Sequence, residues 1–185
     1  LRTGEIDCAI LAEPFPDTGL AIAPLYDEPF VAAVPSTHPL AQQESISTQQ
    51  LKNETMLLLG AGHCFRDHVL EVCPEFARYA SNAEGIRRSF EGSSLETIKH
   101  MVAAGMGVTL VPRLSVANDA LQSPRRRRSD EPYIRYLPIV EPDGSAPPKR
   151  RVSLVWRRSF TRYEAIAALR NAIHACKLLG VERLN

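Results

Sequence analysis

Strand and helix patterns alternate along this chain, and this alternation restricts its fold more than any other feature of the sequence. Short runs rich in Val, Ile, Leu and Phe are separated by turn residues or by segments with helical periodicity. The predicted strands are Ile6–Ala12, Pro29–Val34, Met56–Leu59, Ile86–Phe90, Gly107–Val111, Ile134–Pro138 and Val152–Trp156. Because such alternation is typical of α/β proteins, we predict an α/β fold.

Two segments between these strands carry the clearest helix signals. The first is Ser94–Ala104, for which we predict a capping box made by Ser93 and Glu96 and a left-handed stop at Gly105. The second is Thr161–Leu178, whose apolar residues recur at helical spacing. Both helices are long enough to cover a sheet face.

Charge and composition exclude several classes of protein. The 185 residues contain 22 Lys and Arg against 21 Asp and Glu, and phosphate binding normally needs a concentrated basic excess. Most of the surface is therefore not expected to contact nucleic acid. No apolar run approaches the roughly 20 residues of a membrane span, and no signal peptide opens the chain. We expect a cytoplasmic protein that has no membrane contact and needs no cofactor.

Two segments have the composition of exposed loops. Ser123–Asp130 contains the run Arg125–Arg128, and Glu141–Pro148 is rich in Pro, Gly and Ser. We interpret the arginine run as a solvated loop, with contact to DNA or an acidic partner as the alternative. At the start of the chain, Leu1–Gly4 has the pattern of a helix end, which predicts a fragment of a longer protein.

The segment that carries chemistry lies between two of the four cysteines. A predicted strand and a glycine turn lead into a helix that starts at or just after Cys64 and ends before Pro74. A helix N-terminus stabilises an anion, and the nearby His63 and Arg66 would also favour a thiolate at Cys64. Cys73 lies at the other end of the same helix, so Cys64 is predicted to be the reactive cysteine.

Helix geometry separates the two sulfurs. Nine residues at about 1.5 Å each place the Cα atoms of Cys64 and Cys73 roughly 13 Å apart, whereas a disulfide needs about 4.4–6.8 Å. A bond between them requires the helix to unwind, which is the behaviour of a switch, with Gly60 and Gly62 as a hinge. Two alternatives stay open: inert buried cysteines, and a metal site built from His63, Cys64, His68 and Cys73.

Four parts of the sequence together resemble a known family. The run Gly62–Asp67 (GHCFRD) is followed by Cys73, and Leu1–Ala12 (LRTGEIDCAILA) is similar to the third-strand signature of LysR-type regulators. Ser93–Pro112 and Val152–Arg157 are similar to the helix–strand unit and the crossing strand of the same regulators. With its two cysteines, the chain resembles the OxyR peroxide sensors of the LysR-type family.

The resemblance implies an arrangement of domains. It implies two Rossmann-like subdomains of the periplasmic-binding-protein-like type. Residues 1–27 and 158–185 would form the first, N-terminally incomplete subdomain, and residues 28–157 the second, which carries the redox cysteines. The winged helix-turn-helix domain that binds DNA in this family is absent from these residues.

The resemblance also implies roles for individual residues. Cys64 would be the peroxidatic cysteine and Cys73 would resolve its sulfenic acid to a disulfide. His63, Arg66 and Asp67 match the motif around the cysteine, and Arg157 aligns with an arginine that helps to hold the thiolate. The alternatives are a helix cap for His63, a surface acid for Asp67 and a rim charge for Arg157.

The family's partners are hydrogen peroxide, promoter DNA through the missing domain, RNA polymerase, glutaredoxin with glutathione as reductant, and further copies of the chain in a homodimer or homotetramer. We therefore predict a regulator and not an enzyme. Ser89 replaces a histidine that is common in the family, and the upstream threonines of the peroxide pocket are absent. A thiol peroxidase and a metabolite-binding LysR-type domain are the alternative functions.

Overall fold

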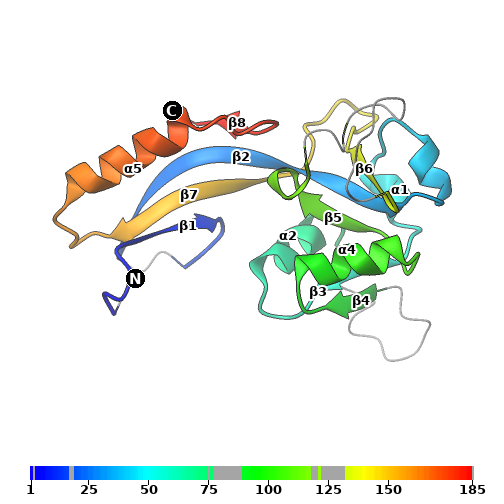
Figure 1. Cartoon of the computed structure of the whole chain (residues 1–185), viewed down its shortest axis with the longest axis horizontal. Helices are drawn as coiled ribbons and strands as arrows, with labels where there is room; N and C mark the ends of the chain where they lie inside the picture. Colours follow the sequence, from blue (N-terminus) through cyan, green and yellow to red (C-terminus); the bar gives the residue numbers. More distant parts are fainter. Residues whose placement is uncertain are drawn as a thin grey trace. The chain divides into compact units, whose positions relative to one another are not determined.

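The chain folds into two compact units, Leu1–Pro29 with Lys149–Asn185 and Phe30–Pro148 (Figure 1). This computed structural model describes every residue except 2, 17, 18, 75, 77–88, 118–120, 122–131 and 185. The arginine run lies outside the described residues. Residues 149–157, which the sequence-based division assigned to the second subdomain, lie in the first unit.

The first unit is an antiparallel sheet with one helix. Its strands are ordered β1 (Cys8–Ala12), β7 (Lys149–Arg157), β2 (Leu20–Pro35) and β8 (Glu182–Arg183). Helix α5 (Tyr163–Ala175) runs alongside β2 and β7 (Figure 1), and its buried Ile166 packs against Leu25 and Leu154 of the sheet. It is shorter at both ends than predicted, since its N-cap is Arg162 and the backbone at Cys176 is already extended.

Strand β2 is much longer than the predicted Pro29–Val34. The strand pairing between β2 and β7 shifts between Pro24 and Tyr26, and this irregularity accommodates the proline inside the strand. Proline lacks the backbone N–H that a regular ladder uses. The bulge removes that conflict, so one strand runs from Leu20 to Pro35.

Charged residues at the start of β7 pair with acidic residues of β2. Arg151 Nε donates to Asp27 Oδ1 at 2.9 Å, Lys149 Nζ lies 2.8 Å from Asp27 Oδ2, and Arg150 pairs with Glu28 at 2.8 Å. The hydrogen bond from Arg151, with a further one from Lys149, lowers the pKa of Asp27 below its usual value of 3.8. These ion pairs explain why β7 begins earlier than its apolar residues predicted.

The second unit is a mixed sheet with helices on both sides. Parallel strands β3 (Met56–Leu59) and β4 (Ser89–Gly92) join β5 (Thr109–Pro112) through a parallel bridge between Met56 and Val108. The second part of β2 lies antiparallel between β5 and β6 (Ile134–Pro138). Residues 86–88 of the predicted strand before β4 lie outside the described residues.

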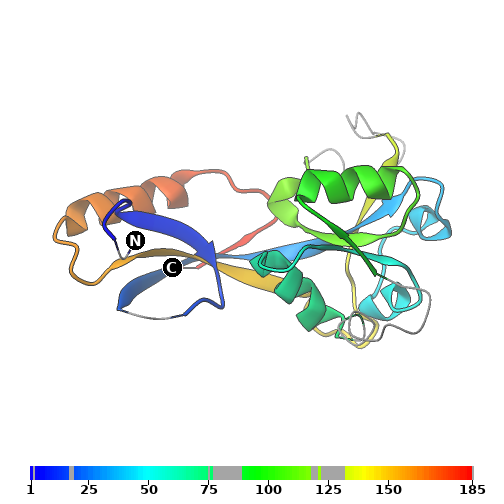
Figure 2. The same cartoon turned by 90° about the horizontal axis from the view of Figure 1, so that it is seen from below.

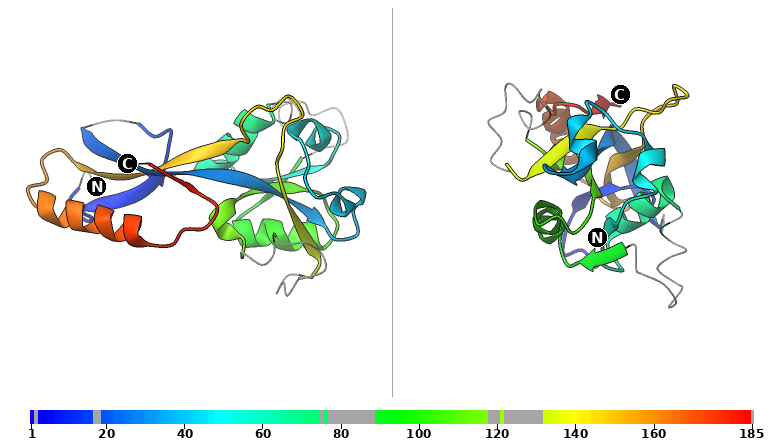
Figure 3. Two further views of the ribbon diagram at one scale, coloured as in Figure 1. Left: turned by 90° about the horizontal axis from the view of Figure 1, so that it is seen from above. Right: turned by 90° about the vertical axis from the view of Figure 1, so that its right-hand side faces the viewer.

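Helices α2 (Cys64–Val72) and α4 (Leu95–Ala103) lie on opposite sides of these strands (Figures 2 and 3). The shorter helices η1 (Pro39–Gln42), α1 (Thr48–Leu51) and η2 (Arg113–Ser115) also belong to the described part of this unit. The four residues of β3 are all buried. The structure thus has the predicted α/β class and two subdomains.

The cap of α4 differs from the prediction. Ser94, not Ser93, is the N-cap, and its hydroxyl accepts a hydrogen bond from the Thr97 N–H at 3.1 Å. Glu96 instead lies 3.3 Å from Lys99. The predicted capping box was wrong because the helix begins one residue later, which places Thr97 at the capped position. The predicted left-handed stop is confirmed by a φ of +78° at Gly105.

Candidate functional site

The loop after β3 leads directly into α2, which begins at Cys64. Gly62 in this loop has a φ of +94°, a conformation that favours glycine. His63 is the N-cap with an extended backbone, and its carbonyl accepts the Arg66 N–H at 2.9 Å. Its side chain makes no capping hydrogen bond, so the alternative role as a side-chain cap is not observed. Cys64 is the first helical residue, as predicted, and it is exposed.

One face of α2 holds the helix on the core. Phe65 and Val69 are 7% and 2% exposed, and the Phe65 ring meets the Phe30 ring edge to face with centroids 5.4 Å apart. His68, 4% exposed, lies with its ring centroid 6.3 Å from each of these two rings. The helix therefore cannot leave its place without exposing apolar surface to water.

Cys73 lies at the opposite end of α2. It is fully buried, and its backbone N–H donates to the Val69 carbonyl at 2.9 Å. Both Cys64 and Cys73 are thiols in this structure. Because α2 is unbroken from Cys64 to Val72, the rise of about 1.5 Å per residue separates the two cysteines by roughly 13 Å. A disulfide between them requires α2 to unwind.

Arg66 is held by the strands beneath the helix. Its Nη1 donates to the Leu59 carbonyl at 2.9 Å and to Glu91 Oε1 at 2.7 Å. Glu91 belongs to β4, where it is in register with Leu58 of β3. Sequence reasoning missed Glu91, since its only signal was an acidic residue at the end of a predicted strand. The predicted effect of Arg66 on the Cys64 thiolate stays a prediction.

The other predicted residues lie in different surroundings. Asp67 is an exposed acid in the first turn of α2. Arg157 lies in the first unit, where its guanidinium donates to the carbonyls of Leu1 and Ile6 and lies 3.7 Å from Asp7. Its predicted role toward Cys64 stays a prediction.

The described part of the chain offers no ligand set for the metal alternative. Among the described residues, no three His, Cys, Asp or Glu side chains gather where they could hold an ion. Within α2, His68 is buried whereas Cys64 is exposed.

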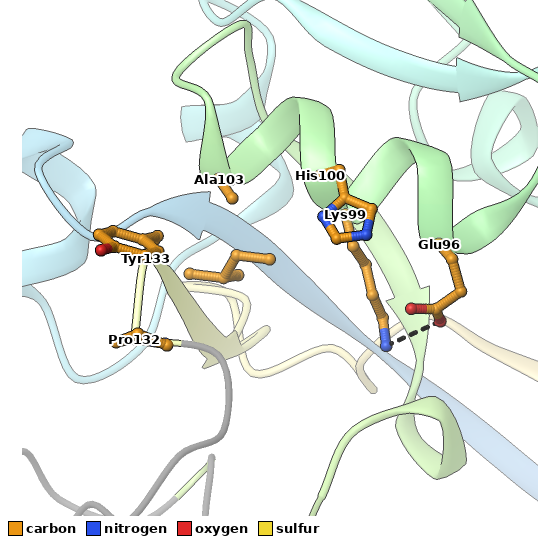
Figure 4. Close-up of a pocket in the computed structure, with 7 residues that line it drawn as sticks. Glu96, Lys99, His100, Ala103, Pro132 and Tyr133 are labelled. Carbon is orange, nitrogen blue, oxygen red and sulfur yellow. Dashed lines mark ion pairs between the residues drawn. The ribbon is translucent and has the colours of Figure 1, made fainter.

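A cavity of about 200 Å³ lies beside α4. Figure 4 shows Lys99 reaching toward Glu96, with His100 next to it and Tyr133 across the cavity. Lys99 Nζ also donates to the Ser115 carbonyl at 3.0 Å. The charge of Lys99 is thus compensated inside the unit, and the cavity offers mostly apolar walls.

None of the helices in the described part of the chain has the length and apolar composition needed to cross a bilayer.

Comparison with known proteins places the chain among bacterial regulators. The family described as LysR substrate binding domain matches residues 1–176. The "Hydrogen peroxide-inducible genes activator" of Pectobacterium carotovorum subsp. carotovorum is 38% identical over 170 residues, which are 90% of this chain and 50% of that protein. The chain thus spans about half the length of the curated relatives it matches.

Two solved structures are similar over nearly the whole chain. A reduced form of OxyR from N. meningitidis is 34% identical with a TM-score of 0.80, and the match covers all of this chain and 78% of that one. The reduced OxyR regulatory domain from Pseudomonas aeruginosa is 39% identical with a TM-score of 0.72, over 95% of this chain and 75% of that one.

Proposed function

Because this chain belongs to the LysR substrate-binding domain family, and within it to the OxyR regulatory domains, we propose that it is the peroxide-sensing part of a transcription regulator. One observation carries the proposal. An exposed Cys64 begins the helix whose other end holds the buried Cys73. One thiol is open to a small oxidant, and the other is held apart from it until the helix opens.

The first step takes place at Cys64. Its thiolate attacks one oxygen of hydrogen peroxide, the O–O bond breaks, and the departing hydroxide takes a proton to become water. The sulfur keeps the attached OH as a sulfenic acid, so the cysteine is oxidised by two electrons and the peroxide is reduced. The free N–H groups at the start of α2 favour the anion that this step requires.

The second step joins the two cysteines. The Cys73 sulfur attacks the Cys64 sulfenic sulfur, the S–OH bond breaks, and water leaves as the disulfide forms. Because α2 separates the residues by roughly 13 Å, this step also unwinds the helix and removes Phe65 and Val69 from the core. The chemistry is thereby converted into a change of packing in the second unit.

The regulatory response involves the whole protein and not this chain alone. We propose that the change in packing alters contacts between copies of the chain, and that a DNA-binding domain beyond these residues transmits it to a promoter. A cytoplasmic location, recruitment of RNA polymerase and reduction by glutaredoxin with glutathione are parts of the same proposal. His63, Arg66 and Arg157 are proposed to support the thiolate, and Asp67 to contribute to the peroxide pocket.

A titration of the full chain with one equivalent of peroxide tests this function. Intact mass and peptide mapping should show the loss of about 2 Da and a crosslink between Cys64 and Cys73. Cys64→Ser should abolish the reaction, and Cys73→Ser should leave a sulfenic acid that dimedone labels. Failure of dimedone to label the Cys73→Ser protein would contradict the resolving role.

The same titration separates the alternatives. Rapid multiple turnover with a thiol reductant would favour a thiol peroxidase, since a switch needs only stoichiometric oxidation. No loss of thiol at micromolar peroxide would favour a domain that binds a metabolite, for which the cavity beside α4 is the candidate site.

A further inference from the structure

Glu91 makes an ion pair at the start of the helix that carries the reactive cysteine. Its carboxylate accepts a hydrogen bond from Arg66 Nη1 at 2.7 Å, while the same nitrogen donates to the Leu59 carbonyl at 2.9 Å. The Gly60 N–H donates to the Gly92 carbonyl at 3.0 Å, so the loop before α2 is fastened to the same strand, β4. Arg66 therefore ties the first turn of α2 to the ends of β3 and β4.

This tie holds the guanidinium of Arg66, which is the one arginine or lysine of α2, on the strands, so that it is not free to approach Cys64. Because Cys64 and Arg66 are two residues apart in the helix, their side chains project from different sides of it. The Arg66 side chain is only 13% exposed, and the Glu91 side chain 52%. Strand β3, which packs against α2, has no charged residue, and the other titratable groups of this first turn are His63 and Asp67. The positive charge nearest to Cys64 in sequence is thus neutralised by Glu91.

We infer that Glu91 is a positioning residue, which acts through Arg66 to limit the fraction of Cys64 thiolate and so sets how much peroxide the sensor needs. This inference rests on the proposed function and deepens it. Glu91 also resists the unwinding of α2, because the first turn cannot leave the strands while Arg66 is bound to them. Removal of the carboxylate charge therefore favours both steps of oxidation.

The variant Glu91→Gln tests this role, because it keeps the shape of the side chain and removes its charge. Glu71→Gln is the matched control, since it removes the same charge from an exposed position at the far end of α2. The first measurement is the pH profile of Cys64 alkylation by iodoacetamide, which reports the thiolate fraction without peroxide. The second is the rate constant for oxidation by hydrogen peroxide at pH 7.

We expect Glu91→Gln to raise both rates about two- to five-fold at neutral pH and to move the alkylation profile to lower pH, because the positive charge of Arg66 is then no longer paired, and one positive charge near a solvated thiolate has an effect of this order. Glu71→Gln and the charge-conserving Glu91→Asp should stay near the wild-type values. In an Arg66→Gln background, Glu91→Gln should change the rates much less, because the group through which it acts is gone.

Equal rates for Glu91→Gln and Glu71→Gln would overturn the inference, as would an effect of Glu91→Gln that persists at full size in the Arg66→Gln background. The proposed function fails by a different result, a wild-type Cys64 that is alkylated normally but does not react with peroxide. Because alkylation needs no peroxide, the alkylation profile tests the role of Glu91 whether or not Cys64 reacts with peroxide.

Discussion

Replacement of Val69 by alanine should shift the reduction potential of the proposed disulfide and not only the stability of the protein. Val69 is 2% exposed on the core face of α2, and its truncation removes buried apolar surface and leaves a cavity. The cost to the reduced protein is about 2 kcal/mol in the free energy of unfolding. If α2 unwinds on oxidation, Val69 is already exposed in the disulfide form, which then loses almost nothing.

The difference between the two forms is measurable as a potential. For a two-electron couple, about 1.4 kcal/mol corresponds to 30 mV, so destabilising only the reduced form by 2 kcal/mol lowers the potential by about 40 mV. Equilibration of the full chain with glutathione buffers, followed by peptide mapping, gives the potential, and urea unfolding under reducing conditions gives the stability.

Val102→Ala is the matched control, because Val102 is fully buried on α4, which the disulfide does not need to unwind. It should lower the stability of both forms equally and leave the potential unchanged. If Val69→Ala loses about 2 kcal/mol of stability in both the reduced and the oxidised protein and shows no shift in potential, Val69 stays buried after oxidation. Helix α2 would then stay folded in the oxidised protein, and the proposed unwinding would be refuted.

Two further predictions concern stability alone. Ser94→Ala should cost about 1 kcal/mol in urea unfolding, because the Thr97 N–H loses its capping hydroxyl, whereas Ser93→Ala should cost little; equal losses would contradict the assigned cap. The hydrogen bond from Arg151 lowers the pKa of Asp27 in the folded state below 3.8, the value of the unfolded chain. The ionised Asp27 therefore contributes its full stabilisation above about pH 4, and this stabilisation is lost as the pH falls through the pKa of the folded state. Asp27→Asn should therefore weaken the loss of stability below about pH 4, and an unchanged acid limb would refute this.

Local patterns predicted those elements whose signals lie within one turn or one short strand. Strands Met56–Leu59 and Ile134–Pro138 and the helix from Cys64 to its end before Pro74 all agree with the structure. Strand β2 was underestimated, because Pro24 is compatible with a strand only through the bulge that β7 allows.

The candidate site also has a part that local sequence patterns predict and a part that they do not. The order of Cys64, helix and Cys73 could be predicted from the sequence, as could the distance that separates the two thiols. The ion pair of Arg66 with Glu91 could not, because 25 residues separate them and the contact depends on β4 lying beside β3 in one register.

By itself, the sequence determined that two cysteines stand at opposite ends of one helix, since periodicity, the glycine turn and Pro74 all act over a few residues. Only the tertiary structure decided that Cys64 is exposed, that Cys73 is buried and that Arg66 is bound by Glu91. Burial and ion pairing depend on which distant segments come into contact, and no local sequence pattern shows which segments these are.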